Sequence, residues 1–160
     1  MRAQDLEALR EHMLAVIAAT AFALRGTIGK SAFDERVMTA MGKVPRYAFV
    51  PIELQPYAYD NIPLPIGFAK TISQPFIVAL MTDLLDIKAN DSVLEIGTGL
   101  GYQAAILAQP ARRVYSVAII EELGQAAKQR LRQQGLAPIP KRSKSPRSTS
   151  TLSRGRSEWA

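Results

Sequence analysis

Three glycines at alternate positions, Gly97, Gly99 and Gly101, separate a β-rich run from a helix-forming run. Glycine adopts backbone conformations that other residues avoid, so such a loop can pass close beneath a ligand and point amides at it. The acidic Glu95, just before the loop, adds a hydrogen-bond acceptor. Tyr102 stands where a dinucleotide-binding loop has its third glycine, and the sequence has no triphosphate-binding loop. The pattern favours a nucleoside ligand without pyrophosphate, typically S-adenosylmethionine, over a merely tight turn between strand and helix.

The residue types exclude several other kinds of chemistry. The 160 residues include no Cys, which excludes disulfides, thiolate metal sites and a Cys nucleophile, and is compatible with a reducing cytoplasm. His12 is the only histidine, so His-cluster metal sites and Ser-His-Asp catalysis are excluded, and we expect no metal site. His12 itself follows Glu11 on a predicted helix and is expected to be solvated. Any reaction must therefore proceed without imidazole.

The glycine loop belongs to a succession of strand, loop, helix, strand and helix. Residues 92–96 and 113–117 are short β-rich runs. Helices are predicted over residues 102–109 and 121–134, the second closed by Gly135. This order is typical of the opening of a parallel α/β sheet, and it places the loop at the carboxyl edge of the sheet, where ligands bind.

The N-terminal region is predicted to begin with an amphipathic helix, because apolar residues recur there at three- and four-residue spacing. This stripe consists of Leu6, Leu9, Met13, Ile17, Ala21 and Leu24. The most apolar stretch, residues 13–24, is shorter than the roughly 20 residues of a membrane-spanning helix. Acidic residues precede it, where a secretory signal requires positive charge. We therefore expect no membrane partner.

Two further helices and a proline-rich stretch complete this region. A helix is predicted over residues 33–41, with Ser31 placed to cap it. Five prolines exclude a continuous helix over residues 44–68, so we expect loops with short extended pieces such as residues 47–50. A third helix follows Ser73. Its predicted inner face consists of Ile77, Leu80, Met81, Leu84 and Leu85.

The net charge of +6 is concentrated at the C-terminal end. Residues 1–135 hold 14 Lys and Arg against 13 Asp and Glu, whereas residues 136–160 hold six against one. The last residues are rich in Ser, Thr and Pro and lack periodic apolar positions, so they are predicted to form a disordered basic tail. The basic tail suggests an alternative function, that of a non-enzymatic binding module that contacts nucleic acid. The lack of a recognition motif argues against nucleic acid as a partner.

Four segments together resemble one enzyme family. Residues 93–105, VLEIGTGLGYQAA, resemble the cofactor loop of protein-L-isoaspartate O-methyltransferases, and residues 64–75, LPIGFAKTISQP, resemble their second hallmark. Residues 44–51 and 57–61 match what that family shows upstream. The resemblance covers roughly residues 5–135. It implies an α/β fold, namely the Rossmann-like fold of S-adenosylmethionine-dependent methyltransferases, with an N-terminal helical subdomain.

The resemblance also implies an activity in protein repair. A methyl group would pass from S-adenosylmethionine to the free α-carboxylate of L-isoaspartyl residues in damaged proteins, and we expect the enzyme to be a cytoplasmic monomer. A carboxylate whose pKa is about 3.5 is ionised at neutral pH, so positioning rather than a general base is required. Ser73 is the predicted catalytic residue, because its hydroxyl and the amides of the following helix can orient that carboxylate. The alternative is that Ser73 only caps its helix.

The other predicted site residues lie in the same two motifs. Ile66, Gly67 and Thr71 are predicted to contact the substrate, with a purely strand-forming role as the alternative for Thr71. Phe68 suits the core as well as the site. The predicted cofactor-binding residues are Glu95, Gly97, Thr98, Gly99, Gly101 and Tyr102.

Two departures from the family pattern fall inside these motifs. In the family, an acidic residue at the end of the second strand binds the ribose hydroxyls of the cofactor, and here that position is Ala118. Alanine cannot accept those hydrogen bonds, which weakens cofactor binding unless Glu121 or Glu122 reaches back. Ala69 and Lys70 stand where the family usually shows Gly and Gln, and this changes the expected geometry of the substrate loop.

A third departure follows Gly135, where the further strands of the family and a Gly-Asp-Gly segment are missing. We therefore predict an incomplete fold with three parts: a helical and substrate-segment region (1–90), the first half of the sheet (91–135) and the tail (136–160). Because two parallel strands do not form an independently stable sheet, a catalytically inactive fragment is the alternative to an active enzyme. The abrupt change suggests the hypothesis that the tail is an out-of-frame reading of the gene, which translation of the other two frames would test.

Overall fold

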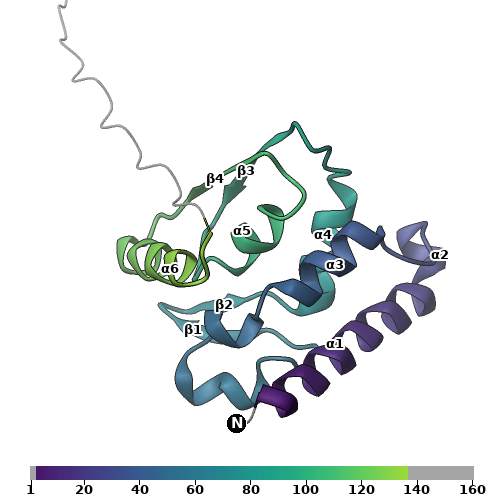
Figure 1. The fold of residues 1–160 in the computed structure, drawn as a ribbon, viewed down its shortest axis with the longest axis horizontal. Helices are drawn as coiled ribbons and strands as arrows, with labels where there is room; N and C mark the ends of the chain where they lie inside the picture. Colours follow the sequence, from purple (N-terminus) through teal and green to yellow (C-terminus); the bar gives the residue numbers. More distant parts are fainter. Residues whose placement is uncertain (1–2, 137–160) are drawn as a thin grey trace, which may run out of the picture.

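The computed structural model describes residues 3–136. Helices pack around a short hairpin and a pair of parallel strands (Figure 1). In chain order the elements are α1 (Ala3–Ala23), α2 (Arg25–Ile28), α3 (Glu35–Lys43), the 3-10 helices η1 (Arg46–Phe49) and η2 (Ile52–Tyr57), β1 (Leu64–Gly67), β2 (Lys70–Ile72), α4 (Pro75–Leu84), β3 (Ser92–Ile96), α5 (Tyr102–Leu107), β4 (Arg113–Val117) and α6 (Glu121–Gln133).

The strands β3 and β4 form a parallel pair, in register from Ser92 opposite Arg113 to Ile96 opposite Val117. A parallel connection needs a crossover, and α5 supplies it. Figure 1 shows α5 and α6 together below the two strands. The predicted order of strand, loop, helix, strand and helix is confirmed, and with it an incomplete Rossmann-like α/β arrangement.

The strands β1 and β2 form an antiparallel hairpin that the sequence did not predict as a pair of strands. Leu64 lies opposite Ile72, and the register shifts between Pro65 and Gly67. Strands of four and three residues, one of them interrupted by proline, give too little alternation to be recognised. The hairpin brings the motif of residues 64–75 to the start of α4.

The stripe predicted on α1 is confirmed at Met13, Ile17 and Ala21, which have no exposed surface. Leu24 lies beyond the end of α1 and is 40% exposed, so it does not belong to the stripe. His12 is exposed, as predicted. None of the helices within residues 3–136 has both the length and the apolarity needed to cross a membrane.

Two local predictions between α1 and the hairpin are wrong. The N-cap of α3 is Asp34, whose side chain accepts a hydrogen bond from the amide of Arg36, so Ser31 does not cap this helix. Residues 47–50 are not extended, because they belong mostly to η1. A proline N-caps each 3-10 helix, since proline fixes the entry φ angle without requiring a backbone donor.

The face that α4 buries is also different from the predicted one. Ile77, Met81, Leu84 and Leu85 are 37–62% exposed. The helix instead buries Pro75, Phe76, Val78, Ala79, Thr82 and Asp83. Because α4 is apolar almost all round, its periodicity fits two opposite faces, and the buried polar residues decide between them. Thr82 accepts a hydrogen bond from Gln103 of α5.

A hydrophobic cluster joins the N-terminal helices to the parallel strands and their helices. It runs from Met13 on α1 through Phe49 and Tyr102 to Leu131 on α6. The predicted boundary between a region of residues 1–90 and a region of residues 91–135 is not tested by this cluster and stays a prediction. The disordered tail was predicted for residues 136–160, of which only Leu136 belongs to the described part of the chain.

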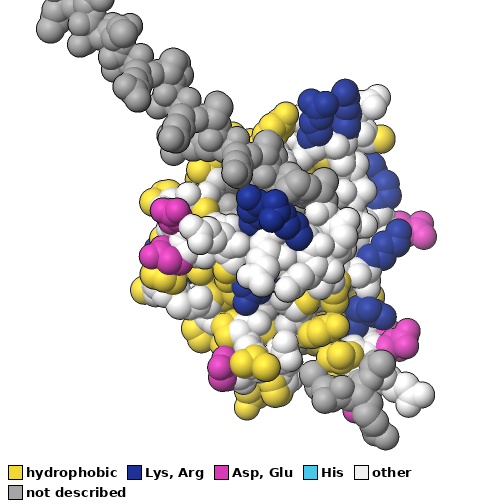
Figure 2. Space-filling view, turned by 60° about the vertical axis from the view of Figure 1, so that its left-hand side comes forward, with side chains coloured by type: hydrophobic (Ala, Val, Ile, Leu, Met, Phe, Trp, Pro, Cys, Tyr) yellow, Lys and Arg dark blue, Asp and Glu magenta, His cyan; other side chains and the backbone are white. Residues whose placement is uncertain are grey.

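One face of the β3–β4 pair is open. Leu94 and Ile96 are 63% and 68% exposed, and Tyr115 on β4 is 40% exposed. Val93, Glu95 and their partners on β4 point toward α5 and α6 and are more buried. On the side of the molecule shown in Figure 2, hydrophobic side chains reach the surface in several places, and the Lys and Arg side chains form separate groups rather than one basic surface.

Candidate functional site

The loop between β3 and α5 has the conformation that its glycines predict. Gly97, Gly99 and Gly101 have φ angles of 100°, 53° and 95°, in the left-handed region that side chains disfavour. Close packing adds a second requirement at two of them. A Cβ atom on Gly99 would lie 3.3 Å from the Ile66 side chain, and one on Gly101 would lie 3.3 Å from Ala127 of α6.

Three amides of this loop already donate to carbonyl groups of β4 or of the loop. The amides of Gly97 and Thr98 both donate to the carbonyl of Val117 at the end of β4, at 2.8 and 3.2 Å. The Gly101 amide donates to the Thr98 carbonyl. Within residues 3–136, only the amides of Gly99 and Leu100 in this loop are left for a ligand. The loop therefore contributes a narrower set of donors than the sequence pattern alone indicates.

Glu95 is linked to the loop by a chain of hydroxyl groups. The register places Ser116 of β4 opposite Glu95 of β3, and the Ser116 hydroxyl donates to the Glu95 carboxylate. Thr98 Oγ1 lies 2.6 Å from Ser116 Oγ. Burial raises the pKa of Glu95 to about 7, and the hydrogen bond from Ser116 opposes this rise.

A groove of about 510 Å³ lies between the hairpin, the glycine loop and the residues that follow β4. Its volume is within the range of about 300 to 1,000 Å³ that small-molecule sites occupy. Apolar side chains and backbone make up most of the lining, and Lys70 is the one charged residue among those described there. The full lining is Ile66, Ala69, Lys70, Thr71, Gly97, Thr98, Gly99, Ala118, Ile119, Ile120 and Leu123.

A smaller cavity, of about 50 Å³, lies between the hairpin and the loop. Ser73 and Thr71 line it from the hairpin side, and Glu95, Gly97 and Thr98 line it from the sheet side. Ile66 and Thr71 line both this cavity and the groove. The structure thus brings together the two motifs that the sequence analysis singled out.

Ser73 does not cap α4. The N-cap residue is Gln74, and its side chain makes no capping hydrogen bond. The amide of Phe76 in the first turn instead donates to Asn61 Oδ1 at 2.9 Å. Ser73 is exposed and its hydroxyl has no hydrogen-bond partner among residues 3–136, so the helix-capping alternative is wrong.

Not every predicted site residue lies in the same setting. Tyr102 reaches the small cavity, but it is 2% exposed and packs in the core against Arg46 and Phe49. Phe68 is 55% exposed at the hairpin turn, so the core alternative for it is wrong. Gly67 stands at the same turn with a φ angle of 89°.

The departures at residues 69 and 118 both fall on the groove. Ala69 has a φ angle of 52°, a conformation that glycine adopts without strain and alanine does not. Ala118 lines the groove without a hydrogen-bonding side chain, and neither Glu121 nor Glu122 is among the residues that line it. The compensation by these glutamates is therefore not seen in the lining.

Two polar residues of the site were missed by sequence reasoning. Ser116 reads as an ordinary residue of a β-rich run, and only the register with β3 places it against Glu95. Gln103 lines the small cavity, donates to Thr82 and leaves its buried Oε1 without a partner among the described residues. Their position on the covered side of β4 and in the first turn of α5 is the only signal that the sequence offers.

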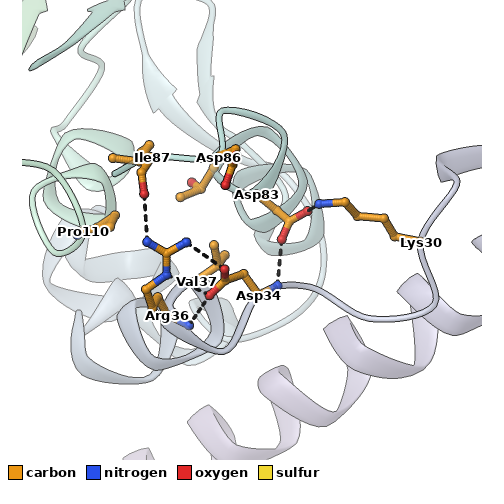
Figure 3. A pocket seen from close by; sticks show the side chains of 9 residues that line it. Lys30, Asp34, Arg36, Val37, Asp83, Asp86, Ile87 and Pro110 are labelled. Atoms are coloured by element: carbon orange, nitrogen blue, oxygen red, sulfur yellow. Dashed lines mark hydrogen bonds and ion pairs between the residues drawn. The ribbon is translucent and has the colours of Figure 1, made fainter. Parts of the chain in front are cut away.

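A third pocket, between α3 and α4, is lined by charged residues that hold these two helices together (Figure 3). The carboxylate of Asp83, which has no exposed surface, accepts hydrogen bonds from Lys30 Nζ at 2.5 Å and from the Asp34 amide at 2.7 Å. Arg36 donates to the Ile87 carbonyl at 2.9 Å. These interactions connect the segment before α3 to the end of α4, and the charged groups serve as hydrogen-bond partners for one another.

Comparison with known proteins agrees with this geometry. The model of the family described as protein-L-isoaspartate(D-aspartate) O-methyltransferase (PCMT) matches residues 26–151. The chain belongs to this methyltransferase family. The match extends beyond residue 135, where the resemblance noted in the sequence ends. Membership does not favour the alternative of a non-enzymatic binding module.

Two curated relatives show how far the similarity to this methyltransferase family extends. The chain is 57% identical over 139 residues to protein-L-isoaspartate O-methyltransferase 1 of Polaromonas sp. strain JS666, covering 87% of this chain and 59% of the relative. It is 57% identical over 123 residues to a protein of the same name from Cupriavidus necator, covering 77% of this chain and 48% of the relative. The chain thus spans about half the length of these methyltransferases.

Solved structures support the methyltransferase fold. A protein-L-isoaspartate O-methyltransferase matches with a TM-score of 0.63 and 23% identity, over 81% of this chain and 40% of its own. A second match has a TM-score of 0.58 and 20% identity, over 80% of this chain and 55% of its own. It is described as a putative protein-L-isoaspartate O-methyltransferase from Plasmodium falciparum in complex with S-adenosyl-L-homocysteine. At these identities the similarity concerns the fold.

Proposed function

We propose that the chain carries the cofactor and substrate sites of an S-adenosylmethionine-dependent methyltransferase that acts on the α-carboxylate of L-isoaspartyl residues in damaged proteins. The observation that carries this proposal is the small cavity in which Ser73 meets Glu95 and the glycine loop. The two motifs are separated in sequence by α4 and β3, yet their side chains line one space. Family membership supports the same reaction.

The residues present fit the proposed cofactor. The left-handed loop leaves space at Gly97, where an added Cβ would meet nothing within 4 Å. The amides of Gly99 and Leu100, unpaired among residues 3–136, offer donors, and the Glu95 carboxyl group offers a cationic ligand an acceptor that is anionic when ionised. The groove beside the loop has the volume of a small-molecule site. Glu95, the glycine loop and the end of β4 would hold the cofactor.

The chemistry that the cofactor supplies when bound is a methyl group on a positively charged sulfur. Against it, the chain must hold an ionised carboxylate in line at about 3 to 3.5 Å. The Ser73 hydroxyl is exposed and unpaired among residues 3–136, so it can donate to one carboxylate oxygen and direct the other toward the methyl group. No side chain has to remove a proton, because the substrate carboxylate is ionised at neutral pH.

The remaining features of the proposal concern partners and place. We propose damaged proteins and peptides with isoaspartyl residues as substrates, a monomeric state and a cytoplasmic location. On the face shown in Figure 2 the basic side chains of the described residues lie in separate groups, and we propose no nucleic-acid partner for this function.

The test is methyl transfer by the complete 160-residue chain. Labelled S-adenosylmethionine and a peptide with one isoaspartyl residue are expected to give labelled peptide, and the same peptide with ordinary aspartate none. Ser73→Ala is expected to lower kcat/KM about 10- to 100-fold, because it removes one hydrogen bond to a charged group. Ser31→Ala, at an exposed serine outside the site, is the matched control. Labelling of both peptides alike, or of neither by a folded chain, would contradict the proposal.

A further inference from the structure

Ser116 connects two parts of the proposed cofactor site but lies outside the motif of residues 93–105 that contains both of them. It lies on β4, whereas Glu95 is on β3 and Thr98 is in the glycine loop. Its hydroxyl donates to Glu95 and lies 2.6 Å from the Thr98 hydroxyl. Because Ser116 has one proton and gives it to Glu95, the Thr98 hydroxyl is the donor in the second bond. Both hydroxyl dipoles therefore point toward the carboxylate.

This arrangement is fixed by the backbone at three points. Glu95 and Ser116 are register partners in the parallel pair. The Thr98 amide donates to the Val117 carbonyl, next to Ser116, and so holds the loop against the end of β4. Gly97 donates to the same carbonyl. The hydroxyl chain is thus a consequence of the strand register and not of one surface rotamer.

Hydrogen bonds from hydroxyl groups favour the ionised form of a buried carboxyl group. At Glu95 burial is the stronger effect and raises its pKa to about 7, while Ser116 lowers it. Among residues 3–136, those that line the cavity bring no opposite charge: Tyr102 is the only other titratable side chain in this lining, and burial raises its pKa as well. Lys70 lines only the adjoining groove.

We propose that Ser116 is a positioning residue, which together with Thr98 orients the Glu95 carboxylate to receive the ammonium group of the cofactor's amino-acid portion. Binding of that cation then drives a proton from Glu95 to solvent. This inference rests on the proposed function, because it takes the ligand of the site to be S-adenosylmethionine or its product.

The experiment measures binding of S-adenosylhomocysteine, which keeps the ammonium group, to the complete chain by calorimetry between pH 6 and pH 9. The affinity is expected to rise about tenfold from pH 6 to pH 8, with release of about half a proton per ligand at pH 7, since Glu95 is about half ionised there. Glu95→Gln is expected to abolish both effects.

Ser116→Ala is expected to raise the midpoint of this transition by about one pH unit, because one hydrogen bond to the charged form is lost. Binding would then be about fivefold weaker at pH 7 and little changed at pH 9. Ser116→Thr keeps the hydroxyl and is expected to restore the original midpoint. A loss of affinity that is equal at every pH would mean a merely structural role and would overturn the proposal.

Titration of Glu95 in the unliganded chain, followed by NMR of labelled glutamate side chains, separates this inference from the proposed function. A higher midpoint in Ser116→Ala than in the unaltered chain supports the positioning role, and equal midpoints overturn it. If the midpoint of Glu95 shifts in Ser116→Ala but the folded, unaltered chain does not bind S-adenosylhomocysteine, the proposed function and the proton release on binding are both overturned.

Discussion

A carboxylate restored at residue 118 is expected to tighten cofactor binding. Ala118 follows β4 directly and lines the groove of about 510 Å³ beside the glycine loop. No acidic side chain is among the described residues that line this groove. Ribose hydroxyls placed there would donate to water instead of to the protein. Ala118→Glu supplies the acceptor at the position where the resemblance to the family expects one.

The structure determines both the expected gain in affinity and the direction in which the new side chain extends. A hydrogen bond to a charged group contributes about 1.5 to 3 kcal/mol, or about 10- to 150-fold in affinity. Because Ala118 is only half-buried, solvent screening favours the lower end, about tenfold. The space between residue 118 and α6 is narrow, because a Cβ atom added to Gly124 of α6 would lie only 3.0 Å from the Ala118 Cβ atom. The new glutamate side chain must therefore extend into the groove.

The assay is calorimetric titration of S-adenosylhomocysteine into the unaltered chain and the variant, at a pH above 8 where Glu95 is ionised. Ala118→Gln has nearly the same shape without the charge and is expected to gain less than half of the free energy. Equal dissociation constants for the unaltered chain and Ala118→Glu, at equal melting temperatures, would refute the reasoning.

Three further predictions concern stability and are each measured by urea unfolding. Ala69→Gly is expected to add about 0.5 to 1 kcal/mol to the free energy of unfolding, because the φ angle of 52° strains alanine. The control Ala8→Gly, at an exposed position of α1, should cost about 1 kcal/mol, and a loss at both positions would contradict the strain. Asp83→Asn is expected to cost about 2 to 3 kcal/mol, because it removes the buried charge that pairs with Lys30 and replaces one of the two carboxylate acceptors by an amide donor. A cost below 1 kcal/mol would mean that the interactions of Asp83 with Lys30 and Asp34 contribute little to stability. Glu95 has a raised pKa in the folded chain, so it contributes stability at low pH that is lost as the pH rises toward and through about 7. Between pH 5 and pH 8 the free energy of unfolding of the unaltered chain should therefore fall by about 2 to 3 kcal/mol more than that of Glu95→Gln. Parallel pH profiles of the two proteins would exclude this contribution.

The parallel strands and the glycine loop could be predicted because their signals are local. The β-rich runs are bounded by turn residues, and the left-handed conformations at Gly97, Gly99 and Gly101 suit only glycine without strain. The meeting of Ser73 with the loop could be expected only from the family resemblance, because α4 and β3 separate them in the sequence.

What the sequence could not determine depended on contacts between distant segments. The buried face of α4 is selected by Asp83, which meets Lys30 and Asp34 from the segment before α3. Ser31 and Asp34 are both good helix caps, and the one used depends on where the chain enters α3. The amides of the loop could be assigned only after Val117 was placed beside it.

The unpaired side of β3 has a consequence for the chain in concentrated solution. Among the described residues β3 pairs only with β4, so a row of backbone donors and acceptors on its other side faces outward, next to the exposed Leu94 and Ile96. Such an edge is a template on which strands of other molecules can add, and natural sheets usually protect it with charge, proline or a covering element. We therefore expect strand addition between molecules to compete with folding as the protein concentration rises, which light scattering at increasing concentrations would measure.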